Sequence, residues 1–247
     1  MNANLDPHEL GTVLGIWAHP DDEAYLSAGL MASAVRAGQR VVVVTATAGE
    51  RGTPDPEHWP PERMARRRRL EMAASLAALG VREHHWLGYP DGGCEDVADD
   101  VAVAELARII ATVQPDTIVT FGPDGMTGHP DHRTVSAWAT RAWREHRPSA
   151  RLWYATVLPE FHHRWAHVNT ALGIFPDDTE APCTPEDEAA GVLRCDDHLL
   201  GVKLAALHAH ASQTGPVVEI IGEEAFRSWW TLEVFADAAR MASGSRA

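Results

Sequence analysis

The pattern of hydrophobic and polar positions predicts strands and helices that alternate along the chain. Short, uninterrupted apolar runs predict strands over residues 13–18, 41–47, 84–87, 117–121 and 152–157. Longer stretches with apolar residues at helical spacing predict helices over 24–37, 61–79 and 97–113, and another that ends near 146. This alternation predicts an α/β protein with a mostly parallel, twisted sheet and helices on both faces.

The pattern becomes less regular after residue 157. Residues 160–196 are interrupted by several prolines, which predicts loops over the edge of the sheet. A helix is expected over 197–211 and a final strand over 229–235. Because no repeat, low-complexity tract or linker divides the chain, we expect one domain over residues 1–247, with a variable region around 158–197 that shapes the choice of substrate.

Composition and charge narrow the class of protein. A chain of 247 residues, 45% of them hydrophobic, can bury the core of one large domain. The formal net charge of −14 argues against nucleic-acid binding, which needs clustered Lys and Arg. Three cysteines without a CxxC pair suit a reducing compartment. With no signal peptide and no apolar run near the roughly 20 residues of a membrane span, we expect a cytoplasmic protein without membrane contact.

Two polar clusters directly follow predicted strands. Residues 18–23, Ala-His-Pro-Asp-Asp-Glu, come after the first strand, and residues 129–132, His-Pro-Asp-His, lie in the loop after the fourth. Parallel strands place their carboxyl ends at one edge of the sheet, where ligands bind, so we expect the two clusters to face one crevice. The acids of the first cluster would repel a phosphate and attract a cation.

The spacing within the clusters is typical of a metal site. His19 and Asp22 are three residues apart across a strand–helix junction, so one ion can reach both. Asp21 lies between them and projects differently, which suits it to accept a proton from a water bound to the metal. Either His129 or His132 can complete the set while the other faces the substrate, and spacing does not choose between them. Two imidazoles, one carboxylate and a water are typical of catalytic zinc, although Fe²⁺, Co²⁺ or Mn²⁺ would also suit such a site.

The sequence resembles the PIG-L/LmbE-type zinc-dependent N-deacetylases. The two clusters together carry the resemblance, and weaker matches are Thr-Ala-Gly-Glu-Arg-Gly at 47–52, Arg68 with Glu71, Leu79-Gly80, and His-Ala-Ser-Gln at 210–213. The resemblance implies a Rossmann-like (LmbE-like) fold with the site at the carboxyl edge of the sheet. It also implies one Zn²⁺ per chain and hydrolysis of an N-acetyl amide on a small molecule that contains an amino sugar, with release of acetate and a free amine.

The resemblance assigns roles to the residues of the two clusters. Asp21 would be the general base. His129 would assist the tetrahedral intermediate as an electrophile or acid, and Asp131 would orient the His129 ring. The zinc ligands would be His19, Asp22 and His132.

Other matched positions concern the substrate. Arg68 and Asp91 correspond to positions that hold sugar hydroxyls in sugar-acting members, although a helix salt bridge and a turn explain them equally well. His210 would form part of the site wall. Some members carry a Tyr two residues before the first His of the second cluster, where this chain has Thr127. The candidates for stacking on a sugar ring are Trp59 and Trp86.

Two other functions stay open from the sequence. One is an amidase for a larger thiol-conjugate or antibiotic-conjugate amide, and the other is a metal-binding protein without catalysis. The presence of Asp21, His129 and Asp131 argues against the second, because binding alone needs no base beside the ligands. Many members of the family assemble into homo-oligomers, so the resemblance leaves a homo-oligomer open.

Overall fold

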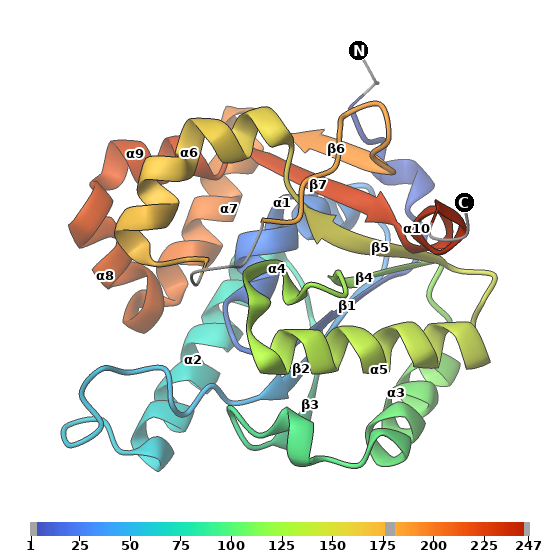
Figure 1. The fold of residues 1–247 in the computed structure, drawn as a ribbon, viewed down its shortest axis with the longest axis horizontal. Coiled ribbons are helices and arrows are strands. Elements are labelled where there is room, and N and C mark those ends of the chain that lie inside the picture. Colours follow the sequence, from blue (N-terminus) through green and yellow to red (C-terminus); the bar gives the residue numbers. More distant parts are fainter. Residues whose placement is uncertain (1–3, 176–180, 245–247) are drawn as a thin grey trace.

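The fold is built on one mixed sheet. The computed structural model describes residues 4–175 and 181–244, and within them seven strands pair in the order β3-β2-β1-β4-β5-β7-β6 (Figure 1). Strands β1 to β5 run parallel to one another, whereas β7 is antiparallel to both β5 and β6. The strands are β1 Val13–Trp17, β2 Val41–Thr47, β3 Glu83–Tyr89, β4 Thr117–Phe121, β5 Arg151–Thr156, β6 Gly191–Arg194 and β7 Leu232–Asp237.

Helices cover both faces of this sheet. Helices α1, α2 and α7 pack against one another on one face, and α3 and α5 pack together on the other (Figure 1). The helices of the first part of the chain are α1 Asp22–Arg36, α2 Pro61–Leu79, α3 Asp99–Val113, α4 Gly125–Gly128 and α5 Pro130–His146, with 3₁₀ turns at Pro7–Glu9 and Cys94–Asp96. The later helices are α6 Pro159–Leu172, α7 Asp197–Ala209, α8 Ala211–Ile221, α9 Glu223–Trp229 and α10 Ala238–Gly244.

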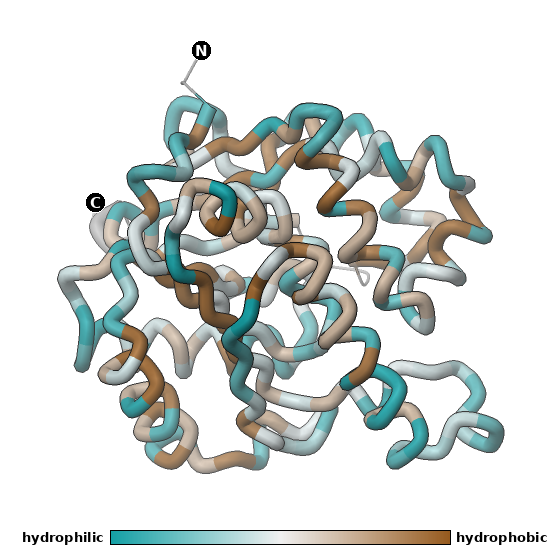
Figure 2. Tube along the Cα trace, turned by 180° about the vertical axis from the view of Figure 1, so that it is seen from behind, coloured by the Kyte–Doolittle hydropathy of each residue, from teal (hydrophilic) through white to brown (hydrophobic). Residues whose placement is uncertain are grey.

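The central strands form because their residues are apolar or β-branched on both faces. Every residue of β1, β2 and β4 is buried, as a parallel sheet between two helical layers requires. Figure 2 shows the hydrophobic residues concentrated on these inner strands, with hydrophilic residues on the outer loops. The fold class predicted from the alternating pattern is therefore confirmed.

The first half of the chain follows the predicted elements closely. Helix α2 starts at Pro61, where a missing N–H costs nothing, and is closed by Gly80 in the left-handed conformation with φ 75°. The exception is the second polar cluster. The sequence predicts a loop through residue 132, but helix α5 already begins at Pro130, so His132 lies in its first turn.

The second half differs from the prediction. Residues 160–196 were expected to be loops, but most of α6 and all of β6 lie there. Helices α8 and α9 were not predicted, and the final strand begins at Leu232 instead of 229. Residues 176–180 of the expected variable region lie outside the described residues. No helix within the described ranges combines the length and the apolar character that crossing a membrane requires.

Candidate active site

The two polar clusters lie side by side at the carboxyl edge of the sheet. Strands β1 and β4 pair in parallel, and from them the chain proceeds to β2 on one side and β5 on the other. The strand order therefore reverses between β1 and β4, which opens a crevice at this point. The Nδ1 atom of His19, after β1, lies 3.1 Å from Nε2 of His132, after β4. The prediction that the clusters share one crevice is confirmed.

Three side chains bring possible ligand atoms close together. Besides the His19–His132 distance, Asp22 Oδ2 lies 3.7 Å from His19 Nδ1, and Asp22 Oδ1 lies 3.5 Å from His132 Nε2. The amide of His19 donates to Asp22 Oδ2 at 2.7 Å and fixes the carboxylate. Nitrogen and oxygen ligands of a tetrahedral zinc ion lie about 3.3 Å from one another. The two ring nitrogens have this spacing, and each ring has one oxygen of Asp22 at a similar distance.

The remaining nitrogens of the two rings already have acceptors. His19 Nε2 lies 3.1 Å from Asp131 Oδ2 and 3.1 Å from Asp91 Oδ1, and His132 Nδ1 lies 2.9 Å from the carbonyl of Gly125. An acceptor at one ring nitrogen places the proton there and leaves the lone pair on the other nitrogen for a metal. Burial lowers the pKa of His132 well below its usual value, so this ring is neutral.

The acids around His19 favour a positive charge at this place. Burial by itself lowers the pKa of His19, but the hydrogen bonds to Asp131 and Asp91 and the charge of Asp22 raise it overall to about 10. A metal cation would supply that positive charge in place of the ring proton. Two sets among the described residues bring one ligand atom from each residue within 4.8 Å of one another; they are His19 with His129 and His132, and His19 with Asp91 and Asp131. In the set of His19, Asp22 and His132, each ring instead contacts a different oxygen of Asp22.

His129 is placed as a hydrogen-bond donor to the cavity. Its Nδ1 accepts the backbone N–H of Asp131 at 3.1 Å, so the neutral ring carries its proton on Nε2. Burial and the nearby His19 lower the pKa of His129, which keeps the ring neutral. The ring lies next to those of His19 and His132, with centroids 4.9 Å from each, and it lines the cavity.

Asp131 has a different role from the one expected. Its carboxylate was predicted to orient His129, but in the structure it accepts hydrogen bonds from His19 Nε2 and from the amides of Gly92 and Cys94. Only the backbone N–H of Asp131 reaches His129. The physical reason is the helix start: Asp131 is in the first turn of α5, and its side chain turns toward the end of β1. Asp131 therefore positions His19.

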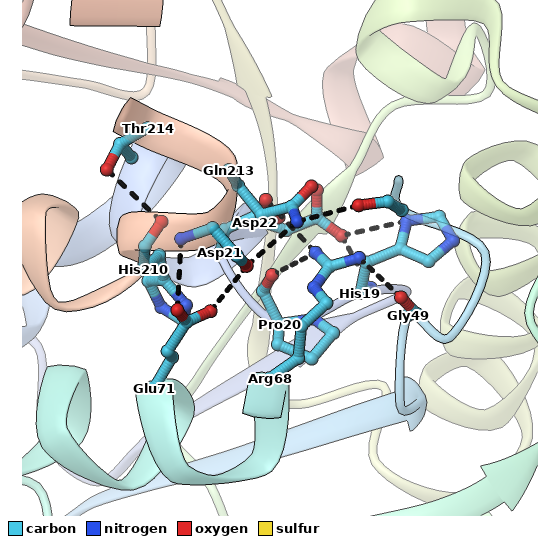
Figure 3. A network of polar contacts seen from close by, with 12 residues as sticks. His19, Pro20, Asp21, Asp22, Gly49, Arg68, Glu71, His210, Gln213 and Thr214 are labelled. Carbon is cyan, nitrogen blue, oxygen red and sulfur yellow. Dashed lines mark hydrogen bonds and ion pairs between the residues drawn. The ribbon is translucent and has the colours of Figure 1, made fainter. Parts of the chain in front are cut away.

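Asp21 occupies a strained backbone position beside the ligands. Its φ of 119° lies in a region that L-residues rarely adopt. Its amide donates to Glu23 Oε2 at 2.9 Å, and Arg68 Nη2 contacts both its carboxylate, at 3.1 Å, and the carbonyl of Pro20 (Figure 3). Burial raises the pKa of Asp21 to about 7 even though Arg68 opposes the rise. This is the range that suits a general base.

Arg68 and Asp91 both line the cavity, and both also have structural partners. Arg68 is 3% exposed, and its Nη1 donates to the carbonyl of Gly49 at 2.9 Å. Position 49 must be Gly, because a Cβ there would lie 2.1 Å from Arg68 Nη1 and φ is +63°. Asp91 accepts the amide of Arg51 at 2.7 Å as well as facing His19. Their predicted contact with sugar hydroxyls stays a prediction.

His210 does not line the cavity, contrary to the prediction. It is fully buried behind the site, where its Nε2 lies 2.8 Å from Glu23 Oε1. Ser75 donates to the same carboxylate at 3.0 Å. Burial would raise the pKa of Glu23, but the charge and hydrogen bond of His210 lower it overall. Since Glu23 holds the amide of Asp21, His210 supports the strained turn from behind.

Replacing His210 by Ala is expected to lower the free energy of unfolding by about 1–3 kcal/mol, because Glu23 loses a partner in a fully buried place. The KM for substrate should change little, because the ring does not reach the cavity. Urea unfolding and steady-state kinetics measure the two effects. The control is His208→Ala in the last turn of α7, two residues before His210, since His208 is exposed. A large rise in KM without loss of stability would contradict this assignment.

A cavity of about 480 Å³ opens at the crevice, and its lining includes residues that the sequence did not single out. Thr127 and Tyr25 both lie in this lining. Trp59 and Trp86 do not line it; they lie under Arg63 and Arg69 respectively. Apart from Tyr25, the large aromatic residues that do line it lie in or just after α6 and α9, and no motif marks them. They are Phe161, Phe175, Trp229 and Trp230.

An open α/β sheet with a His and Asp cluster at its switch point is typical of metal-dependent hydrolases. Comparison with known proteins gives the family. The family model for GlcNAc-PI de-N-acetylase (PIG-L) matches residues 14–143, and the chain belongs to this family. The resemblance inferred from the motifs is confirmed.

Individual relatives agree with this assignment. The chain is 31% identical to a 1D-myo-inositol 2-acetamido-2-deoxy-alpha-D-glucopyranoside deacetylase of Kineococcus radiotolerans, over 86% of this chain and 74% of the relative. It is 32% identical to the protein of the same name from Acidothermus cellulolyticus, over 87% and 86%. Among solved structures, the N,N'-diacetylchitobiose deacetylase of Pyrococcus horikoshii has a TM-score of 0.66 at 23% identity, over 94% of this chain and 85% of that one, which supports the fold.

Proposed function

We propose that this protein is a zinc-dependent N-deacetylase, which hydrolyses an N-acetyl amide on a small molecule containing an amino sugar and releases acetate and a free amine. The observation that carries the proposal is the close approach of His19, Asp22 and His132 beside Asp21, in the wall of the cavity. The relatives named as deacetylases of N-acetylglucosamine compounds support the substrate class.

The ligands proposed for zinc are His19, Asp22 and His132, whose spacing and fixed ring protons suit that ion. A zinc ion bound there would supply Lewis acidity, which polarises an amide carbonyl and makes a water molecule more acidic. The alternative set of His19, His129 and His132 would use His129 as a ligand. Because Nδ1 of His129 already accepts a backbone amide, we assign this ring to the substrate and not to the metal.

Two residues, Asp21 and His129, act on the proton and on the developing negative charge. Asp21 accepts a proton from the attacking water, whose oxygen forms the new bond to the acyl carbon. The Nε2–H of His129 donates a hydrogen bond to the oxygen of the amide as negative charge develops there. When the carbon–nitrogen bond breaks, Asp21 passes the proton that it took from the water to the departing amine. Arg68 holds the carboxylate of Asp21 toward the site throughout.

Release of acetate and of a free amine tests the proposal. A panel of N-acetylated glucosaminides, including inositol-linked and antibiotic-linked compounds, is offered to the zinc-loaded protein. Turnover should disappear with a chelator and return when zinc is added. A protein that binds zinc stoichiometrically but hydrolyses none of the panel would instead be a metal-binding protein without this activity.

The His132→Ala variant is expected to lose zinc, because removal of one of three protein ligands weakens binding by roughly 100-fold or more. The purified wild-type chain should hold about one zinc ion. Elemental analysis after dialysis measures the content. The matched control is His198→Ala, since His198 is an exposed residue of α7. If His132→Ala keeps a full equivalent of zinc, the proposed ligand set is wrong.

A further inference from the structure

The cavity has two chemically different sides. The side toward the sheet carries the charged residues of the candidate active site, such as Asp21, Arg68 and Asp91. The other side is formed by residues of one hydrophobic cluster, and we call it the apolar wall. It consists of Phe161, Ile174, Val217, Trp229 and Trp230, with Tyr25 where the two sides meet.

Helices that are separate in sequence build the apolar wall. Phe161 comes from α6, Val217 from α8 and Trp229 from the end of α9, and these three helices lie together beside the sheet (Figure 1). Aromatic packing fixes the wall in place. The ring centroid of Trp230 lies 4.5 Å from that of Trp229 and 4.9 Å from that of Tyr25. The wall is therefore a preformed surface of rigid side chains.

Few polar groups are offered along this wall. The polar side chains of α6 and α8 that line the cavity beside it are His162, Asn169 and Gln213. His162 Nδ1 and Asn169 Nδ2 lie 3.5 Å from each other, and Gln213 Nε2 already donates to the carbonyl of Gly52 and to Ser212 Oγ. A polyhydroxylated group seated here would give up hydrogen bonds to water and regain few of them. An alkyl chain or an aromatic ring would gain by leaving water. A wall of this kind suits the apolar part of a ligand, with the polar part fixed by the few charged groups opposite.

Building on the proposed deacetylase function, we propose that the substrate carries an apolar group, an alkyl chain or an aromatic ring, joined to its N-acylated amino sugar. The amide lies at the candidate metal ligands, and the apolar group lies against the apolar wall. This distinguishes the chain from its relatives, whose names give an inositol at the corresponding end of the substrate. The apolar group can be the aglycone or a longer N-acyl chain, and the experiment separates these sources.

Binding of reaction products tests the proposal without depending on turnover. Methyl, butyl and hexyl glycosides of glucosamine are titrated into the zinc-loaded, full-length protein by calorimetry. Each buried methylene group should tighten binding by roughly fourfold, so the hexyl glycoside should bind at least about tenfold more tightly than the methyl glycoside. A parallel series of acetate, butanoate and hexanoate tests the acyl side. Affinity that does not rise in either series would overturn the proposal.

A pair of matched variants places the effect at the wall. Val217→Thr keeps the size of the side chain and adds a hydroxyl. In the series whose affinity rises with chain length, this variant should bind the longest ligand about fivefold more weakly and the shortest ligand nearly as tightly as the wild type. Ile220→Thr is the control, because Ile220 is 60% exposed on the same helix and does not line the cavity. Equal losses in the two variants would contradict the assignment to the wall.

Turnover of the corresponding N-acetyl glycosides, measured in parallel, separates this inference from the proposed function. Acetate release that is equally efficient for methyl and hexyl glycosides, with flat binding in both series, would leave the deacetylase function standing and overturn the apolar group. Binding that tightens with chain length while no amide is hydrolysed would support the wall and contradict the deacetylase function.

Discussion

Replacing Asp21 by Asn is expected to lower kcat for deacetylation by roughly 10²–10⁴-fold while zinc content stays unchanged. Asn keeps the size of the side chain but cannot accept the proton of the attacking water. It also tolerates the backbone φ of 119° at this position better than most residues, so the turn should remain intact. Asp21 is not among the proposed zinc ligands, and steady-state kinetics together with elemental analysis separate loss of the base from loss of the metal.

The pH profile gives an independent check on Asp21. The base acts as a carboxylate, so kcat/KM of the wild type should fall as pH drops through its pKa. Burial raises the pKa of Asp21 to about 7, and a bound cation would lower it, which places the acid limb below pH 7. The pH profile of the residual activity of Asp21→Asn should lack this acid limb. The control is Asp55→Asn, because Asp55 is an exposed loop residue. Full activity in Asp21→Asn would rule out this base.

The central fold was predictable because its signals are local. Strands β2 and β4 were placed with the correct limits, since each is a short run of apolar and β-branched residues buried on both faces. Helix α2 was placed correctly because Pro61 and Gly80 mark its ends chemically. The meeting of the two polar clusters followed from topology alone, because any two neighbouring parallel strands deliver their following loops to the same edge.

The later part was not predictable because its prolines were taken as breaks. Pro159 is the first residue of α6, where a proline is tolerated, so it marks the start of a helix. Pro216 lies inside α8, six residues after His210 and at a position that propensity would not allow. Tertiary packing overrides propensity there, since α8 contributes Val217 to a cluster with Trp165 and Trp229.

The supporting contacts of the site were also beyond prediction, for a different reason. Glu23 and His210 are separated by 187 positions, and Asp131 and His19 by 112. No spacing rule relates residues so far apart, so their motifs could be recognised but their partners could not. Consequently, Asp131 was assigned to His129 instead of His19, and His210 was expected in the cavity wall although it lies behind it.

The Glu233→Gln variant is expected to lower the free energy of unfolding by about 3–5 kcal/mol, because it leaves Lys203 as a buried charge without its counterion. The side chains of Lys203 and Glu233 are 0% and 1% exposed, and Nζ lies 2.8 Å from Oε1. The same carboxylate accepts the amides of Gly29 and Leu30 in α1, so the pair joins α1, α7 and β7. Urea unfolding measures the loss.

The matched control is Glu83→Gln, which removes one partner of the exposed Arg40–Glu83 pair at the sheet surface and should change stability far less. A second variant, Lys203→Met combined with Glu233→Gln, removes the buried positive charge and should recover much of the loss. This recovery would show that the cost comes from an unpaired charge and not from lost packing. Since Lys203 also donates to the carbonyl of Tyr25, which lines the cavity, the buried pair couples the stability of the fold to the shape of the site.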